Sequence, residues 1–350
     1  MNKRFIVTAL ALMLVAVIGI FALAACAEPD ADEDAQEYIK VVDASGAEIE
    51  VPVNPTRVAV YDYSTLDILN NVDFTKTGIE QLIVPTKSSL PEELKYYADL
   101  PGDKVISGGS LFYVDWDVLD LVQPQLVILG GRSFGMDADG NRLGTDAAAE
   151  FRESTYARYS NTKFIKLSVN STDSSLVPDM ERNAGVLAKI FNKVSVDGKL
   201  NEIKNKIADI KTKAEASEST ALFCMMVDQT TLSVFNVGSR FDMLYEDFGF
   251  TPVDPNAEAW TDAHGLTARA EYVLEQNPDV IFVLDRSATV GTGGGFANLM
   301  ADEVIKQTEA YKNGHIYVLS GNAWYTMTGG FTAAEAMVAD LQKYFDDLED

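Results

Sequence analysis

The chain contains one helix–strand unit twice, and both copies end in an arginine. The copies are VDWDVLDLVQPQLVILGGR (Val114–Arg132) and ARAEYVLEQNPDVIFVLDR (Ala268–Arg286). In each copy an amphipathic stretch stops at a proline, Pro124 or Pro278, which cannot continue a helix. The apolar run after the proline is typical of a strand buried on both faces, as in a parallel sheet. A chain with this repeat is expected to form two α/β lobes.

The position of the two arginines predicts a ligand site. Each lies eight residues after its proline, at or just past the end of the expected strand. Open α/β sheets bind ligands at the carboxyl ends of their strands. Because both lobes place a cation at that edge, Arg132 and Arg286 predict a cleft that accepts an anion.

The order of the expected elements divides the chain into lobes and a connector. At 350 residues the chain is long enough for two domains. Strands and helices alternate in an N-terminal lobe, residues 38–172, and in a C-terminal lobe, residues 218–350. Residues 173–217 have apolar positions at helical spacing, broken near Val194–Gly198. We expect an α/β fold of two Rossmann-like lobes joined by one long helical connector, with Ser64 capping the first helix.

The N-terminus has the pattern of a targeting segment rather than of a folded element. Lys3 and Arg4 precede the uncharged stretch Phe5–Ala25, and the sequence LAAC ends at Cys26. This order resembles the lipobox of bacterial lipoproteins, in which the signal peptide, here residues 1–25, is cut before a cysteine that is then acylated. The alternative is a transmembrane anchor, since 21 uncharged residues are enough to span a bilayer.

Residues 26–37 are then an acidic tether. Six of the eleven residues in the segment 27–37 are acidic, too many for an apolar face to be buried. The whole chain has a net charge of −25, and removal of the signal peptide makes it more negative. This charge argues against nucleic acid or an anionic lipid surface as a partner. An anion site on such a chain depends on clustered arginines.

Three further residues stand in connections that follow strands, where functional groups collect. Arg240 follows the sequence NVGS at the expected start of a helix, where the helix dipole favours an anion, so a shared bound anion would explain a cation there. His264 lies on the expected turn TDAHGLT, and Tyr325 lies in NAWYTMTGG. The alternatives are a turn residue for His264 and core packing for Tyr325. No GxSxG or HExxH motif is present, so we do not expect an enzyme.

Several stretches resemble the ferric catecholate siderophore-binding lipoproteins of ABC importers, of the enterobactin and petrobactin uptake type. They are VAVYDYSTLDIL, HGLTARAEYVLEQNPDVIFVLDR and TEAYKNGHIYVLSGNAWYTMTGG, and the resemblance extends over residues 55–345. It implies the class III periplasmic-binding-protein fold, with a ferric siderophore held between the lobes. It also implies a monomer that binds and does not catalyse. This monomer is lipid-anchored to the outer face of the cytoplasmic membrane and delivers its ligand to an ABC permease and its ATPase.

The resemblance implies roles for individual residues in ligand binding. Three arginines meet the catecholate oxygens in that family, and the matching positions here are Arg132, Arg240 and Arg286, with Trp324 beside them. Arginine forks suit the paired oxygens of such an anion. Iron(III) enters as part of the bound siderophore, and no intrinsic cofactor is implied.

The same resemblance implies which residues contact the iron and which dock on the permease. His264 and Tyr325 complete the iron shell when the siderophore offers four oxygens, whereas a siderophore with six leaves them no position. Acidic residues on the lobes dock on permease arginines in this family. The candidates here are Glu92, Glu93 and Glu246.

One loop departs from the family pattern and keeps the ligand identity open. The loop Ser133–Asp146 is longer than in the family, so it is expected to cover the cleft or to alter ligand choice. Asp137, Asp139 and Asn141 have the spacing of a calcium loop, but Arg142 stands where glycine is needed, which disfavours calcium.

Other functions were weighed against the siderophore interpretation. Haem or cobalamin is the alternative within the same fold, although those ligands need the arginines less. A surface adhesin or assembly protein is the alternative outside transport, and it would need no convergent arginines. Two histidines are too few for a manganese or zinc importer.

Overall fold

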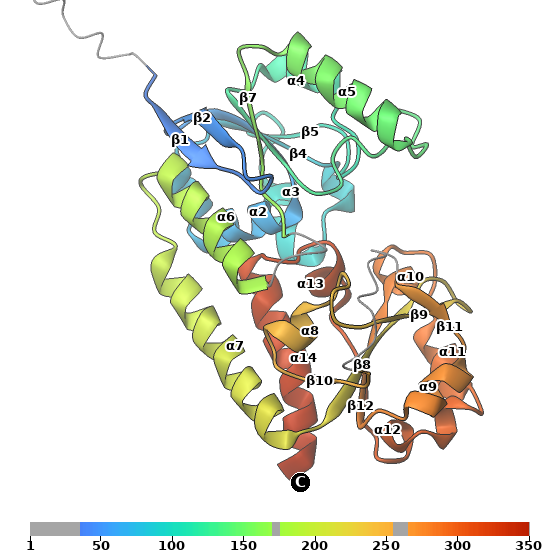
Figure 1. Ribbon diagram of the computed structural model, residues 1–350. Coiled ribbons are helices and arrows are strands. Elements are labelled where there is room, and N and C mark those ends of the chain that lie inside the picture. Colours follow the sequence, from blue (N-terminus) through green and yellow to red (C-terminus); the bar gives the residue numbers. More distant parts are fainter. Residues whose placement is uncertain (1–35, 170–175, 255–264, 350) are drawn as a thin grey trace, which may run out of the picture. The chain divides into compact units, whose positions relative to one another are not determined.

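The computed structural model describes residues 36–169, 176–254 and 265–349 (Figure 1). The expected signal peptide, Cys26 and His264 lie outside these ranges. Contacts divide the chain into Met1–Glu37 and Tyr38–Asp350, and the architecture below is that of the second unit. Within the described ranges, no helix has the length and apolar content needed to cross a membrane.

The N-terminal half is built on a five-stranded sheet in which every pair is parallel, as the sequence predicts. The strands, in spatial order, are β5 (Val105–Ser107), β4 (Gln81–Val84), β3 (Arg57–Tyr61), β6 (Leu126–Leu129) and β7 (Lys163–Lys166). All four residues of β6 are buried because both faces of the sheet are covered: Leu126 and Ile128 pack in one apolar cluster, and Val127 and Leu129 pack in another. An antiparallel hairpin precedes this sheet and consists of β1 (Tyr38–Val42) and β2 (Glu48–Pro52).

The C-terminal half is built on a six-stranded mixed sheet, which differs from the parallel arrangement of a Rossmann-like lobe. The strands are β11 (Leu266–Ala268), β9 (Leu232–Phe235), β8 (Thr220–Met226), β12 (Val280–Asp285) and β13 (Ile316–Val318), with β10 (Thr251–Pro252) also on β8. β8, β10, β12 and β13 are parallel, whereas β9 pairs antiparallel with β8 and with β11. β9 is antiparallel to β8 because only a short turn joins the two strands, and such a turn reverses the direction of the chain. Asp228 closes that turn by accepting the backbone N–H groups of Thr230 and Thr231.

The expected connector consists of two helices rather than one. α6 (Leu176–Ile190) and α7 (Asp197–Ser217) are separated near the break that the sequence pattern shows. The buried face of α7 consists of the apolar residues at helical spacing, Leu200, Ile203, Ile207, Ile210 and Ala214.

Shorter helices connect the strands in both halves. In the first half they are α2 (Tyr63–Asn71), α3 (Lys95–Asp99), α4 (Trp116–Val122) and α5 (Thr145–Arg158), with 3₁₀ turns at Phe74–Thr77, Lys87–Ser89 and Glu92–Leu94. In the second half they are α8 (Met243–Glu246), α9 (Ala270–Gln276), α10 (Arg286–Thr289), α11 (Phe296–Ala301), α12 (Glu309–Lys312) and α13 (Gly321–Tyr325), with a 3₁₀ turn at Ile305–Gln307.

The cap of α2 is Asp62, which corrects the expectation that Ser64 takes this role. The helix begins at Tyr63, so Asp62 occupies the capping position, and its carboxylate accepts the backbone N–H of Thr65 at 2.8 Å. Ser64 lies inside the first turn and donates its hydroxyl to the same carboxylate.

The last helix, α14 (Phe331–Glu349), ties elements from both halves together. It runs beside α7, and its first turn contacts α2 (Figure 1). Asp67 of α2 is fully buried and accepts the backbone N–H of Ala333 at 3.1 Å. Asn71 of the same helix donates to the Thr332 hydroxyl at 2.9 Å. Segments that the sequence assigns to different lobes therefore share this contact.

Asp67 is expected to lower the stability of the fold as the pH rises toward neutrality. Burial raises the pKa of its carboxyl from 3.8 to about 6, against the hydrogen bonds from the start of α14 that lower it. Because the folded pKa lies above the unfolded one, the contribution is fully present below pH 3.8 and is lost as the pH rises through 6. Relative to Asp67→Asn, we expect the free energy of unfolding of the unsubstituted protein to fall by about 2–3 kcal/mol across this interval.

Urea denaturation of both proteins at a series of pH values measures this difference. A difference that stays constant with pH would contradict the assignment.

Candidate functional site

A cavity of about 660 Å³ lies where the carboxyl ends of β6 and β12 meet α13. This volume falls within the usual range for small-molecule sites, about 300–1,000 Å³. Residues from both halves line it, among them Asp62, Phe112, Gly131, Arg132, Arg142, Ser168, Met225, Thr231, Ser233, Arg240, Phe241, Gly265, Arg286, Trp324, Tyr325 and Thr328.

Arg132 and Arg286 reach this cavity from equivalent strand ends, which confirms the geometry that the repeat predicts. Arg286 directly follows β12, and Arg132 follows β6 after Gly130 and Gly131. Gly130 is required because an added Cβ would lie 2.7 Å from a carboxylate oxygen of Asp62. The backbone therefore passes close to the cap of α2 before it presents Arg132 to the cavity.

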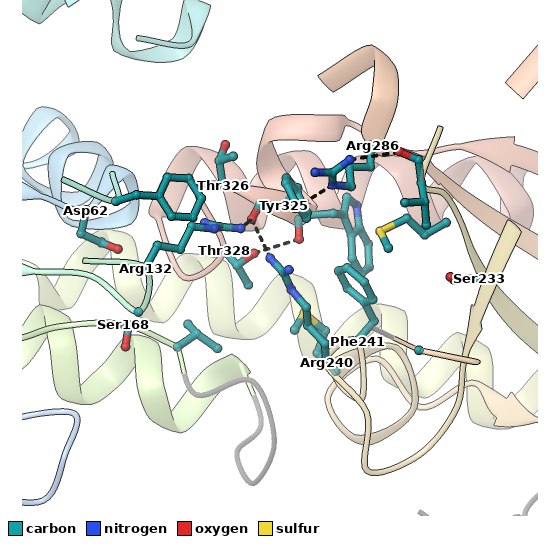
Figure 2. Close-up of a pocket in the computed structure, with 18 of the residues that line it drawn as sticks. Asp62, Arg132, Ser168, Ser233, Arg240, Phe241, Arg286, Tyr325, Thr326 and Thr328 are labelled. Atoms are coloured by element: carbon teal, nitrogen blue, oxygen red, sulfur yellow. Dashed lines mark hydrogen bonds between the residues drawn. The ribbon is translucent and has the colours of Figure 1, made fainter. Parts of the chain in front are cut away.

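Three guanidinium groups converge on Tyr325 (Figure 2). Arg132 and Arg240 both donate to its backbone carbonyl oxygen, at 2.5 Å and 2.9 Å. Arg286 donates Nε–H to its phenolic oxygen at 2.9 Å and an Nη1–H to the carbonyl of Val227 at 3.0 Å. The guanidinium carbons of the three arginines lie 4.9, 4.5 and 5.7 Å from the centre of the tyrosine ring. Two cations from the C-terminal half and one from the N-terminal half thus meet at one residue.

The clustered charge shifts the pKa values of the groups involved. Burial and the repulsion from Arg132 lower the pKa of Arg240 to about 10. Burial raises the pKa of Tyr325, but the hydrogen bond from Arg286 and the charges of all three arginines outweigh it, so that the net pKa is lowered. The site therefore favours negative charge, whether it is a phenolate or a bound anion.

Arg240 reaches the cluster by a route that differs from the expected one. The sequence predicts it at the start of a helix, but α8 begins only at Met243 and has four residues. Arg240 instead follows a turn in which Ser239 donates its backbone N–H to the carbonyl of Asn236. It lies against Phe241, 5.4 Å from the ring centre. Its place is therefore fixed by packing and by Tyr325, not by a helix end.

Trp324 and the region of His264 border the same cavity. Trp324 lines it but has no exposed surface, because its indole packs on Phe223 and donates to Asp340 at 3.1 Å. His264 is outside the described residues, while the next residue, Gly265, lines the cavity. Iron ligation by His264 and Tyr325 stays a prediction.

The sequence analysis missed Arg142 as a cavity residue. It lies in the loop after Arg132 and lines the cavity with an exposed side chain. In the sequence it stood out only because it breaks the calcium pattern. Asp137, the first position of that disfavoured calcium pattern, accepts the backbone N–H groups of Asp139 and Asn141 at 3.0 Å and 2.8 Å and thereby closes a turn.

The three acidic docking candidates are all exposed. Glu92 lies 3.5 Å from Lys95, and Glu93 accepts a long hydrogen bond of 3.5 Å from Asn322 of α13. The side chain of Glu246 projects from α8 into solvent. Their role in docking stays a prediction.

Within the described ranges, no group of three or more His, Cys, Asp or Glu side chains is placed to hold a metal ion. The cavity is lined by four guanidinium groups and one phenol against the single carboxylate of Asp62, so the balance of its described side chains favours an anion.

The fold and this cavity are those of a solute-binding protein, and residues 58–323 match the periplasmic binding protein family. The chain belongs to this family.

Among its relatives, the petrobactin-binding protein YclQ of Bacillus subtilis is 27% identical over 95% of this chain and 97% of YclQ. The ferric-anguibactin-binding protein FatB of Vibrio anguillarum is 23% identical over 83% of this chain and 82% of FatB. The crystal structure of the periplasmic catecholate-siderophore binding protein VctP of Vibrio cholerae superposes with a TM-score of 0.72. It is 27% identical and covers 88% of this chain and all of VctP.

Tyr325 is expected to ionise below the other tyrosines of the protein. Its pKa is lowered from 10.0 by the hydrogen bond from Arg286 and by the three charges, which together outweigh burial. In an alkaline titration followed by tyrosinate absorbance, subtraction of the Tyr325→Phe curve should reveal one group that titrates below pH 10. Arg286→Gln should move that step upward. A subtracted step at or above the pH of the remaining tyrosines would contradict the described cluster.

Proposed function

We propose that this protein captures a ferric catecholate siderophore in the cavity and delivers it to an ABC permease for iron uptake. The observation that carries the proposal is the convergence of Arg132, Arg240 and Arg286 on Tyr325. These three cations form no ion pair with a carboxylate among the described residues, so the site favours a multiply charged anion.

The chemistry of a ferric catecholate suits these groups. The complex is a compact anion whose charge resides on paired oxygens, which guanidinium forks can meet two at a time. Its aromatic rings suit a cavity that also contains Phe112, Phe241 and Tyr325. The lowered pKa of Tyr325 suits a phenolate ligand for iron(III), a hard acid that accepts phenolate oxygen.

The relatives support the same substrate class. YclQ binds petrobactin, FatB binds ferric anguibactin, and VctP binds catecholate siderophores, according to their names. All three are binding proteins, which fits a chain that binds and does not catalyse.

The denticity of the siderophore determines what the protein adds to the iron. A ligand with four oxygens leaves two positions, which His264 and Tyr325 would fill. A siderophore with six oxygens would be bound by the arginines alone, without a protein ligand to the iron. In the first case Arg286 would keep its hydrogen bond to the phenolic oxygen of Tyr325, then an iron-bound phenolate. In the second case its remaining N–H groups would donate to the siderophore oxygens.

Removal of one cavity arginine is expected to weaken binding of a ferric bis-catecholate. Arg240→Gln and Arg286→Gln should each raise Kd about tenfold or more, because each deletes a charge-assisted hydrogen bond in a half-buried site. Quenching of the intrinsic tryptophan fluorescence by the iron(III) complex measures Kd.

Arg152→Gln is the matched control for these variants, since Arg152 is exposed on α5 and does not line the cavity. It removes the same charge and should leave Kd unchanged. Quenching by haem or cobalamin and not by the ferric complex would contradict the proposed substrate. Equal effects of Arg152→Gln and Arg286→Gln would contradict the proposed site.

The proposal extends to the membrane and the permease. The N-terminal pattern favours cleavage before Cys26, acylation of that cysteine and attachment to the outer face of the cytoplasmic membrane. Glu92, Glu93 and Glu246 would dock on the permease, which works with its ATPase, and the protein would act as a monomer.

Cys26→Ala is expected to block lipid attachment. Mass spectrometry of the protein extracted from membranes should find an acylated N-terminal Cys26 in the unsubstituted protein and no acylated form in the variant. A mature chain that still contains residues 5–25 would contradict processing as a lipoprotein and favour a transmembrane anchor.

A further inference from the structure

Arg142 differs from the other three arginines of the cavity in what its side chain contacts. Arg132, Arg240 and Arg286 are half-buried and engaged with Tyr325. Arg142 lines the same cavity from its exposed rim, and its guanidinium has no hydrogen-bond or ion-pair partner within the described part of the chain. A ligand in the cavity can therefore reach Arg142 without displacing any protein contact of that side chain.

The loop that carries Arg142 is a fixed hairpin. Met136 and Arg142 face each other in an antiparallel bridge, and Leu143 donates its backbone N–H to the carbonyl of Gly135 at 3.0 Å. Asp137 closes the turn between them by accepting two backbone N–H groups. The backbone at position 142 is thus held before a ligand arrives, which reduces the entropy lost on binding.

The base of this hairpin is hydrogen-bonded to the segments that carry Arg132 and Phe112. Gly135 donates its backbone N–H to the carbonyl of Arg132 at 3.1 Å, and Met136 donates to the carbonyl of Phe112 at 3.3 Å. Phe134 at the base is buried and packs edge to face against Phe151, with 5.3 Å between ring centres. Arg132 and Arg142 are therefore presented to the cavity by one continuous, anchored segment, one from the interior and one from the rim.

We propose that Arg142 is a fourth anion-binding residue, which selects siderophores that carry a carboxylate outside their iron-chelating oxygens. This inference rests on the proposed function. The three inner arginines surround the place where a ferric centre would meet Tyr325, so a cation at the rim would meet whatever projects from that centre. A planar guanidinium fork pairs with a carboxylate through two parallel hydrogen bonds. A siderophore with a neutral backbone could not form this pair. The selectivity is the difference between its binding free energy and that of a siderophore with a carboxylate.

Two matched ferric complexes test this inference. One is the iron(III) complex of the bis-catecholate amide of lysine, which carries a free carboxylate. The other is the iron(III) complex of the bis-catecholate amide of cadaverine, which is the same chelator without the carboxylate. Fluorescence titration should give a Kd about fivefold or more lower for the lysine derivative, as expected for one charge-assisted pair at a partly exposed site.

Substitution of Arg142 should remove this preference and little else. In Arg142→Gln the two Kd values should agree within about twofold, because the lysine derivative loses affinity and the cadaverine derivative does not. Arg142 is exposed, so the thermal unfolding midpoint should stay unchanged. Arg152→Gln removes the same charge away from the cavity and should keep the preference.

The outcomes separate this inference from the function on which it rests. If both complexes bind tightly and equally, or if Arg142→Gln keeps the preference, the role of Arg142 is overturned and the siderophore function stands. If neither complex binds the unsubstituted protein, the proposed function and the inference fall together. Loss of the preference in Arg152→Gln as well would assign it to overall charge and overturn the role of Arg142.

Discussion

The cavity depends on three guanidinium groups that share one tyrosine and form no ion pair with a carboxylate among the described residues. Like charges brought together in a half-buried site repel, and burial together with this repulsion lowers the pKa of Arg240 to about 10. The shift corresponds to a cost on the order of 3 kcal/mol for keeping that side chain charged. The carbonyl and the phenol of Tyr325 offset only part of it, since they carry partial charges. An anion that enters the cavity supplies the missing charge, so the same arrangement that is costly without a ligand favours its binding.

The rest of the fold holds these cations where they are. β6 and β12 are buried interior strands of their sheets, and their carboxyl ends deliver Arg132 and Arg286 to the cavity. α13 brings Tyr325 between them, and Trp324 anchors that short helix in the core through its hydrogen bond to Asp340 of α14. α14 in turn contacts α2 through buried Asp67. A continuous series of packed and hydrogen-bonded elements thus connects the site to both sheets.

The sequence predicted those parts of the site that depend on regular structure. The spacing from Pro124 to Arg132 and from Pro278 to Arg286 places both arginines at strand ends, because the strand length is fixed by its apolar run. The mixed second sheet was not predicted, since the direction of β9 depends on how tightly the turn at Asp228 closes. Arg142 was missed for the same reason, because its place depends on a hairpin that irregular backbone hydrogen bonds create. The central role of the Tyr325 carbonyl has no counterpart in the sequence, because every residue has a carbonyl.

A crystal structure of the protein with an iron(III) bis-catecholate, in which anomalous scattering locates the iron, tests the proposed site most directly. We expect an iron peak in the cavity beside Tyr325, with catecholate oxygens within hydrogen-bond distance of the guanidinium groups of Arg132, Arg240 and Arg286. An iron peak outside the cavity, or a bound complex in which none of the three guanidinium groups lies within hydrogen-bond distance of a catecholate oxygen, would contradict the proposed site.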